Sequence, residues 1–142
     1  MARIDFYVVA GSGESVRQRF ACRLAEKAYR LKNTVHIEVA DPGTAQIMDE
    51  MLWTFRDGSF VPHDVLQPGA SDATAPVTIG SRSSDQAKPD LVINLTSEIP
   101  QGKDSFARIA EIVTSDDNCK VSSRQKFSTY RKEGHSLETH KI

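Results

Sequence analysis

The sequence has 142 residues, which is the size of one domain, and we predict a single domain over residues 1–142. Hydrophobic residues make up 39% and charged residues 26%, a balance that excludes disordered and fibrous chains. The 18 basic residues nearly cancel the 19 acidic ones. The resulting net charge of -1 argues against tight, sequence-blind binding to nucleic acid.

The sequence predicts neither a membrane segment nor a secretory leader. No apolar run approaches the roughly 20 residues of a membrane span, and residues 1–10 lack the basic start and long apolar stretch of a signal peptide. Cys22 and Cys119 are far apart in the sequence, which favours two reduced, partly buried thiols over a redox pair. We therefore expect a cytoplasmic protein.

The first half of the chain alternates between strand and helix signals. Residues 4–9 are rich in β-branched and aromatic side chains and end at a glycine-rich turn, which predicts a strand. Over residues 14–31, apolar side chains recur every three or four positions, as on one face of a helix. Residues 35–39 alternate as in a strand, and an Asp-Pro start signal predicts a helix over residues 42–55.

The second half has shorter elements separated by glycine and proline. These residues predict irregular connections near 57–76 and 80–90. A strand over 91–95 is nearly all apolar, as expected for a strand buried on both faces. The other predicted elements are a strand over 77–79, a fifth strand or short helix over 108–113, a helix over 118–133 and a polar tail over 135–142.

This order of elements predicts an α/β fold, in which a mostly parallel sheet lies between helices in three layers. Gly11-Ser12-Gly13 lies where such a fold holds a phosphate group. A dinucleotide fingerprint requires a small residue where Val16 stands, and the Gly-Lys-Ser/Thr of a P-loop is absent. We therefore favour a fold without a phosphate loop. The alternative is a small α/β enzyme or nucleotide-binding protein that uses the Gly11-Ser12-Gly13 turn.

Sequence motifs for metal binding and nucleophilic catalysis are missing. The four histidines show no HExxH spacing, and neither cysteine belongs to a CxxC pair. No Gly-x-Ser-x-Gly elbow is present either. We expect no catalytic residue, no metal and no cofactor.

Aromatic residues near the end of the second predicted helix suggest a protein-binding surface. Trp53 projects away from the apolar arc of that helix, and large exposed rings are common at binding hot spots. Phe60, Val61 and Pro62 follow in the irregular connection. The spacing fits a partner-binding patch of these four residues. It fits equally a helix that frays before Trp53, so that the ring folds back with Phe60 onto the core.

The last predicted helix has a one-sided charge, with five basic residues and no acid between Lys120 and Lys132. Lys120, Arg124, Phe127 and Arg131 lie within about 60° of one another on a helical projection. Such a stripe suits an acidic peptide that ends in a hydrophobic residue. Alternatively, the aromatic residues anchor the helix to the sheet and the basic ones are solvated, while weak binding to single-stranded DNA is a third candidate.

Several segments together resemble one family, the chi subunit of the bacterial DNA polymerase III holoenzyme. The most specific is Leu52-Trp53 followed by Phe60-Val61-Pro62-His63. The others are Asp5-Phe6-Tyr7, the strand over residues 90–95, and Tyr130-Arg131 with Gly134.

The resemblance implies a non-catalytic accessory subunit of an assembly with DNA-directed DNA polymerase activity. One surface would bind the psi subunit, which links chi to the clamp loader, and another would bind the acidic, phenylalanine-terminated tail of single-stranded DNA-binding protein. A DNA-repair helicase is a competing partner for the psi-binding surface in this family.

The resemblance also implies roles for particular residues. By position, Trp53 and Phe60 match psi-facing residues, while Val113, Arg124 and Phe127 match the tail-binding region. Ser128 stands where some relatives have a lysine, and Phe127 where they have a tyrosine. Basic residues that could replace the missing charge are Lys120, Lys126 and Arg131.

Overall fold

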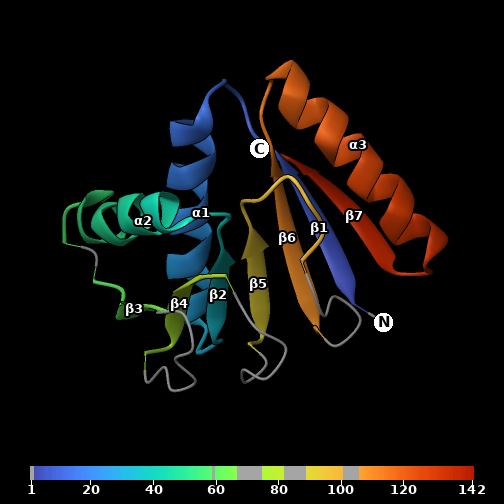
Figure 1. The fold of residues 1–142 in the computed structure, drawn as a ribbon. Helices are drawn as coiled ribbons and strands as arrows, with labels where there is room; N and C mark the ends of the chain where they lie inside the picture. Colours follow the sequence, from blue (N-terminus) through green and yellow to red (C-terminus); the bar gives the residue numbers. More distant parts are fainter. Residues whose placement is uncertain (1, 59, 67–74, 82–88, 101–105) are drawn as a thin grey trace.

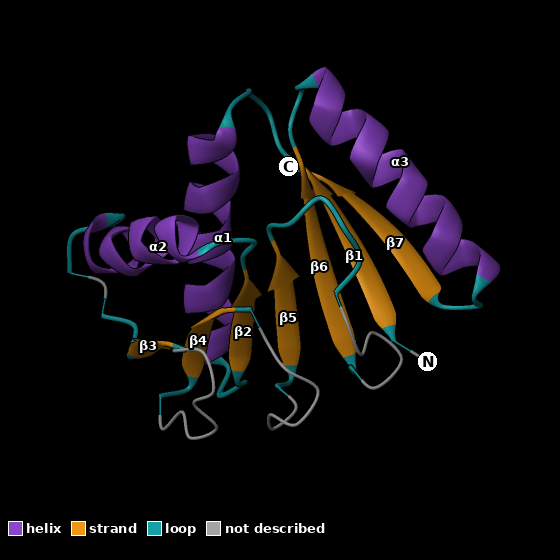
Figure 2. Ribbon diagram, in the orientation of Figure 1, coloured by secondary structure: helices purple, strands orange, loops and turns teal. Residues whose placement is uncertain are grey.

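All strands of the computed structural model lie in one parallel sheet (Figures 1 and 2). The structure describes residues 2–58, 60–66, 75–81, 89–100 and 106–142. Within these ranges the strand order is β3-β4-β2-β5-β6-β1-β7. The strands are β1 (Arg3–Val8), β2 (Val35–Glu38), β3 (His63–Val65), β4 (Val77–Gly80), β5 (Leu91–Asn94), β6 (Arg108–Val113) and β7 (Ser136–Lys141). The helices are α1 (Glu14–Arg30), α2 (Pro42–Thr54) and α3 (Asp117–Lys132).

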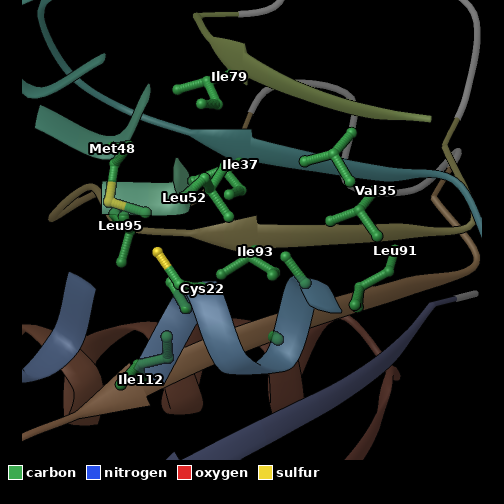
Figure 3. Packing of buried hydrophobic residues seen from close by; sticks show 14 of the residues in the cluster. Cys22, Val35, Ile37, Met48, Leu52, Ile79, Leu91, Ile93, Leu95 and Ile112 are labelled. Carbon is green, nitrogen blue, oxygen red and sulfur yellow. The ribbon is translucent and has the colours of Figure 1, made fainter. Parts of the chain in front are cut away.

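The helices cover both faces of the sheet and create two hydrophobic cores. On one face, α1 and α2 pack against β2, β4 and β5, and Cys22, Met48 and Ile37 meet in the larger core (Figure 3). On the other face, α3 packs its Tyr130 and Phe127 onto the opposite side of β1 and β6. Because successive strand residues point to opposite faces, β1 contributes to both cores. The predicted three-layer α/β/α fold with a parallel sheet is therefore confirmed.

Local signals explain where α2 begins. Asp41 has extended backbone geometry, and its carboxylate accepts a hydrogen bond of 2.7 Å from the Thr44 N–H. Pro42 occupies the first helical turn, where its missing N–H costs nothing. The helix then continues through Trp53, so it does not fray before that residue. Ile47, which the apolar arc would place in the core, is 48% exposed.

The C-terminal segment corrects the prediction of a polar tail over 135–142. Residues Ser136–Lys141 form β7, an edge strand that pairs in parallel with β1. Its side chains are mostly exposed, so its sequence lacks the apolar alternation that marks a half-buried strand. Backbone pairing holds it instead, and the Ile142 N–H donates to the Val8 carbonyl at 2.9 Å.

Two other segments differ from or refine the sequence predictions. Residues 108–113 form a strand and not a short helix, because they pair with β1 on one side and β5 on the other. The irregular connection near 57–76 contains the short strand β3, which pairs with β4. Residues 59 and 67–74 of that connection, and residues 82–88 of the other, lie outside the described residues.

Candidate functional site

An aromatic surface lies where α2 meets β3, at one edge of the sheet. Trp53 is 50% exposed and Phe60 is 63% exposed. Their ring centroids are 5.6 Å apart with a tilt of 42°, so the two rings lean on each other. We call Trp53 and Phe60, with the half-buried Pro62, the aromatic surface. Its rings are neither sealed in the core nor fully solvated, so much of their apolar area remains available for a partner.

The residues between and behind these rings hold the surface in place. Val61 is fully buried in the larger core, so its side chain anchors the segment and does not face outward. His63 packs against Trp53 at a centroid distance of 4.5 Å. Its Nδ1 lies 2.7 Å from the Val61 carbonyl oxygen, and its Nε2 lies 3.0 Å from an oxygen of the Asp49 carboxylate. The imidazole therefore ties the loop after α2 back onto that helix.

A second candidate surface is a groove between α3 and the sheet. Phe6 and Val8 of β1 and Val113 of β6 form much of its apolar lining, together with Phe127 of α3. Phe6 and Phe127 contact each other at a centroid distance of 5.3 Å. The cavity has a volume of about 260 Å³, which is smaller than the roughly 300–1,000 Å³ of a small-molecule site. Its remaining lining residues are Lys120, Ser123, Arg124 and Thr139. We call it the α3 groove.

Four of the five residues predicted for tail binding meet at this groove: Val113, Lys120, Arg124 and Phe127. The fifth, Arg131, is exposed on α3 but does not line the cavity. Within the described part of the chain, no carboxylate pairs with the side chain of Lys120, Arg124 or Arg131. Two unpaired cations therefore border an apolar groove.

Lys126 is not one of these exposed basic residues, although it lies in the same basic stretch of the sequence. It is only 6% exposed, and its ammonium lies 2.7 Å from the Glu111 carboxylate. It also donates to the Thr96 carbonyl at 3.1 Å. Lys126 is therefore a buried partner of Glu111 and cannot supply the charge that Ser128 lacks.

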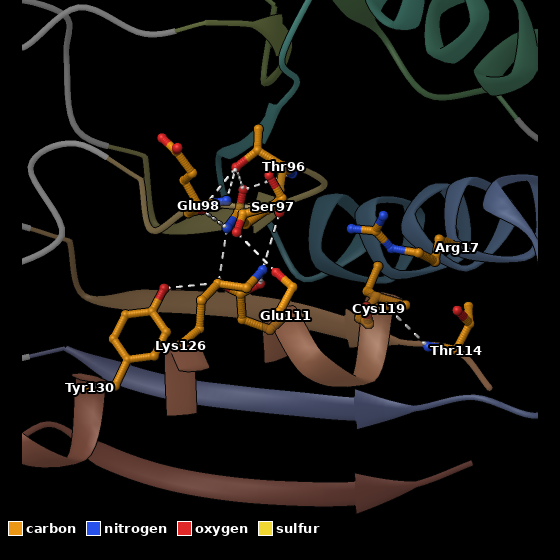
Figure 4. Close-up of polar contacts among 12 residues, drawn as sticks. Arg17, Thr96, Ser97, Glu98, Glu111, Thr114, Cys119, Lys126 and Tyr130 are labelled. Atoms are coloured by element: carbon orange, nitrogen blue, oxygen red, sulfur yellow. Dashed lines mark hydrogen bonds and ion pairs between the residues drawn. The ribbon is translucent and has the colours of Figure 1, made fainter. Parts of the chain in front are cut away.

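A buried polar network around Glu111 fixes α3 to the sheet (Figure 4). The Tyr130 hydroxyl and the Asn94 amide donate to one oxygen of this carboxylate at 2.8 and 2.9 Å, and Lys126 binds the other oxygen. Burial, reinforced by the negative charge of Glu111, raises the pKa of Tyr130 far above its usual range. Tyr130 is therefore a neutral hydrogen-bond donor at all physiological pH values.

A charged cluster joins β1, β6 and β7 at the opposite edge of the sheet. Oxygen and nitrogen atoms of Asp5, Glu138 and His140 lie within 4.8 Å of one another, a spacing that a metal ion could use. The Asp5 carboxylate, however, already accepts hydrogen bonds from Arg108 at 2.6 Å and His140 at 2.8 Å. Arg3 also lies 3.2 Å from it. We interpret the group as an ion-pair cluster that attaches β7.

The Gly11-Ser12-Gly13 turn follows β1, and both of its glycines have positive φ angles. The Gly13 N–H, which a phosphate loop would direct at its ligand, donates to the Asp116 carboxylate at 2.8 Å. This bond and a second from the Thr114 hydroxyl lower the pKa of Asp116. A carboxylate of the chain itself therefore uses the amide that a bound phosphate would need in such a loop.

Comparison with known proteins identifies the family. The model of the family described as DNA polymerase III chi subunit, HolC, matches residues 1–138. The chain belongs to the DNA polymerase III chi subunit family.

Full-length relatives support this membership in the chi family. The DNA polymerase III subunit chi of Pseudomonas aeruginosa is 39% identical over 142 residues, which are 100% of this chain and 98% of the relative. That of Haemophilus influenzae is 31% identical, with 97% and 96% covered. That of Escherichia coli is 29% identical, with 98% and 97% covered.

Solved structures outside the chi family share the fold. The C-terminal domain of the DEAD-box protein Dbp5 superposes with a TM-score of 0.61 at 15% sequence identity, over 99% of this chain and 90% of that domain. A structure of Saccharomyces cerevisiae Dbp5 bound to RNA gives a TM-score of 0.57 over 98% of this chain and 41% of Dbp5. At this identity the likeness describes the fold alone.

Sequence reasoning missed half of the α3 groove. Phe6 and Val8 were assigned only to a strand, and Thr139 fell in the predicted tail. The alternation of Phe6 and Val8 within the first strand could have indicated that both face the same helix. The chi-family residues predicted on α3 are thus one wall of a groove whose other wall comes from β1 and β7.

Proposed function

We propose that this chain is a non-catalytic connector within DNA polymerase III. Its aromatic surface binds the psi subunit, and its α3 groove binds the acidic C-terminal tail of single-stranded DNA-binding protein. The observation that carries the proposal is the α3 groove, where two unpaired cations border an apolar cavity. Membership of the chi family supports a role in DNA replication, which takes place in the cytoplasm.

The chemistry of the groove suits a peptide that ends in an aromatic residue. The terminal ring packs against Phe6 and Phe127, where it exchanges water for apolar contacts. The terminal carboxylate and nearby acids bind Arg124 and Lys120, which are exposed and face the same opening. Arg131 extends the positive surface along α3 for acids further from the terminus. Because the charged contacts are exposed, added salt weakens the complex.

The aromatic surface suits a different partner. Trp53 and Phe60 offer exposed apolar rings, and buried Val61 and His63 keep them in position. Pre-positioned aromatic anchors are typical of hot spots in protein complexes. This favours psi at the aromatic surface, with a DNA-repair helicase as a competitor for the same residues.

The alternative function, a small enzyme or nucleotide-binding protein that uses the Gly11-Ser12-Gly13 turn, has less support. The Gly13 amide is already bonded to Asp116, and the turn lacks the lysine of a phosphate loop. Thermal-shift measurements with nucleotides provide the direct check, since a true ligand raises the melting temperature by mass action.

A peptide titration tests the α3 groove. We expect Arg124→Ala to weaken binding of a fluorescent tail peptide by about tenfold to a hundredfold, because a charge-assisted bond contributes about 1.5–3 kcal/mol. Lys132→Ala, which removes an exposed cation of the same helix outside the groove, is the matched control and should leave the affinity nearly unchanged. Equal affinities for the wild type and Arg124→Ala would remove the tail from this groove.

Co-purification tests the aromatic surface. We expect Trp53→Ala to lose the psi subunit while the melting temperature falls by only a few degrees, because the ring is already half exposed. Ile47→Ala is the control, since Ile47 lies on the same helix with nearly the same exposed fraction. A variant that unfolds, or one that retains psi, would show that Trp53 serves the fold instead.

A further inference from the structure

A crevice opens at the carboxyl ends of β1 and β6, which are neighbours in the sheet. The helices that follow these strands leave in opposite directions: α1 covers one face of the sheet and α3 covers the other (Figure 1). In open parallel sheets, ligands bind where neighbouring strands direct their helices to opposite faces. The crevice is separate from both surfaces described above, although it shares the edge of Ser123 with the α3 groove.

The crevice contains a cavity of about 390 Å³, within the range of small-molecule sites. The first turn of α1 and the first turn of α3 form two of its sides, and the segment after β5 that carries Thr96 and Ser97 forms the third. Neither helix has a side-chain cap at its N-terminus. Two helix ends with positive partial charge therefore border the same cavity.

Arg17 provides an independent indication of a ligand. It lines the cavity and is only 8% exposed. Its Nη1 donates to the Glu14 carboxylate at 2.6 Å, but its Nε is buried and makes no hydrogen bond within the described part of the chain. Figure 4 shows the guanidinium turned from α1 toward the Ser97 segment. A buried, unsatisfied guanidinium donor is costly, and an anion in the crevice would satisfy it.

The acids near the crevice leave room for such an anion. Asp116 lines the crevice, but one oxygen of its carboxylate accepts hydrogen bonds from both the Gly13 amide and the Thr114 hydroxyl. The Glu14 carboxylate is exposed and bonds to Nη1 of Arg17, so it does not occupy the Nε side of the guanidinium. Arginine binds oxyanions side-on through the parallel N–H groups of Nε and Nη2, so a tetrahedral oxyanion can bond to Nε while Glu14 stays on Nη1.

From this geometry we propose that the crevice binds a phosphate group, either as inorganic phosphate or as the phosphate of a mononucleotide. Arg17 is the main ligand, and backbone amides at the starts of α1 and α3, which have no side-chain cap, supply further donors. The site differs from a phosphate loop, because its donors do not come from the Gly11-Ser12-Gly13 turn. The proposal is independent of psi and tail binding.

Amide chemical-shift titrations test the site, with inorganic phosphate in one arm and adenosine monophosphate in the other at constant ionic strength. We expect saturable shifts that are confined to the first turns of α1 and α3 and to Ser97. Tighter binding of the nucleotide would identify a nucleotide site, whereas equal binding would identify a site for the phosphate group itself.

Variants decide whether Arg17 is responsible. Arg17→Gln should weaken phosphate binding by about tenfold or more, and Arg19→Gln, an exposed arginine on the same helix, should not change it. Glu14→Gln should tighten binding, because it removes a negative charge beside the bound anion. This exposed substitution keeps the test decisive even if Arg17→Gln fails to fold. Unsaturable shifts up to millimolar phosphate, or unchanged affinity in Glu14→Gln, would overturn the proposal.

Discussion

His63 determines how the aromatic surface is held. Its ring contacts Trp53 on one side, while its two nitrogens bind the Val61 carbonyl and the Asp49 carboxylate. The His63 side chain is fully buried, so these bonds are largely removed from water. His63 therefore holds the aromatic surface in position and is not one of its exposed contacts.

We predict that His63→Ala lowers the free energy of unfolding by about 1–3 kcal/mol, because it leaves the Val61 carbonyl without its partner. Psi binding should weaken with it, whereas tail binding should not change. Urea denaturation followed by the two binding assays measures these effects. Unchanged stability together with lost psi binding would mean that His63 contacts psi directly.

At the level of elements, β7 shows how a strand forms without an apolar pattern. Its partner β1 is central and strongly apolar, and the buried Asp5 carboxylate binds His140 of β7. Burial alone would raise the pKa of Asp5, but the hydrogen bonds from His140 and Arg108 outweigh it and hold the pKa below 3.8. The cluster therefore stabilises the protein only while Asp5 is ionised.

Asp5 makes the attachment of β7 sensitive to acid. A carboxyl group with a lowered folded-state pKa contributes its full stabilisation above the unfolded pKa of about 3.9 and loses it as the pH falls through the folded value. We predict that the wild type loses melting temperature below about pH 4 more steeply than Asp5→Asn, which is less stable at neutral pH. Parallel curves of melting temperature against pH for the two proteins would contradict this role.

The attachment of α3 depends on Glu111. We predict that Glu111→Gln costs about 3–5 kcal/mol of unfolding free energy, because the buried ammonium of Lys126 loses its counter-charge. Chemical denaturation measures the loss. Glu138→Gln, an exposed carboxylate in β7, should change stability by less than about 0.5 kcal/mol. Similar losses in the two variants would show that the Glu111 network does not hold α3.

A strand or helix can be predicted from the sequence when at least one of its faces is buried. The central strands and α1 have clear periodicity because one or both faces are covered, and their predicted ranges agree with the structure within about two residues. β7 lies at an exposed edge and β3 has only three residues, so neither has a pattern to detect. The helical spacing left open whether Trp53 was exposed or folded back onto the core, and it gave no sign that Val61 is buried.

At the level of the whole molecule, the sheet separates the two proposed docking surfaces. The aromatic surface lies at the β3 edge beside α2, and the α3 groove lies near the β7 edge on the opposite face (Figure 1). The groove itself could not be predicted in full, because its walls come from β1, β6, α3 and β7, which are not all close in sequence. Within the described residues, no helix has the length and apolar character of a membrane span.

In the proposed connector, this separation would allow both partners to bind. A contact repeated over many tails raises the local concentration of the attached polymerase without requiring any single contact to be strong. That effect requires psi and the tail to be bound at the same time. Coupling between the surfaces should be close to zero, since they rest on two separate hydrophobic cores on opposite faces of the sheet.

The most direct measurement of this central claim is the affinity of the tail peptide for the chain alone and for the chain saturated with psi. We predict that the two dissociation constants agree within about twofold, and that Trp53→Ala changes neither. Displacement of the tail peptide by psi would show that the two ligands share one surface, which would contradict the account.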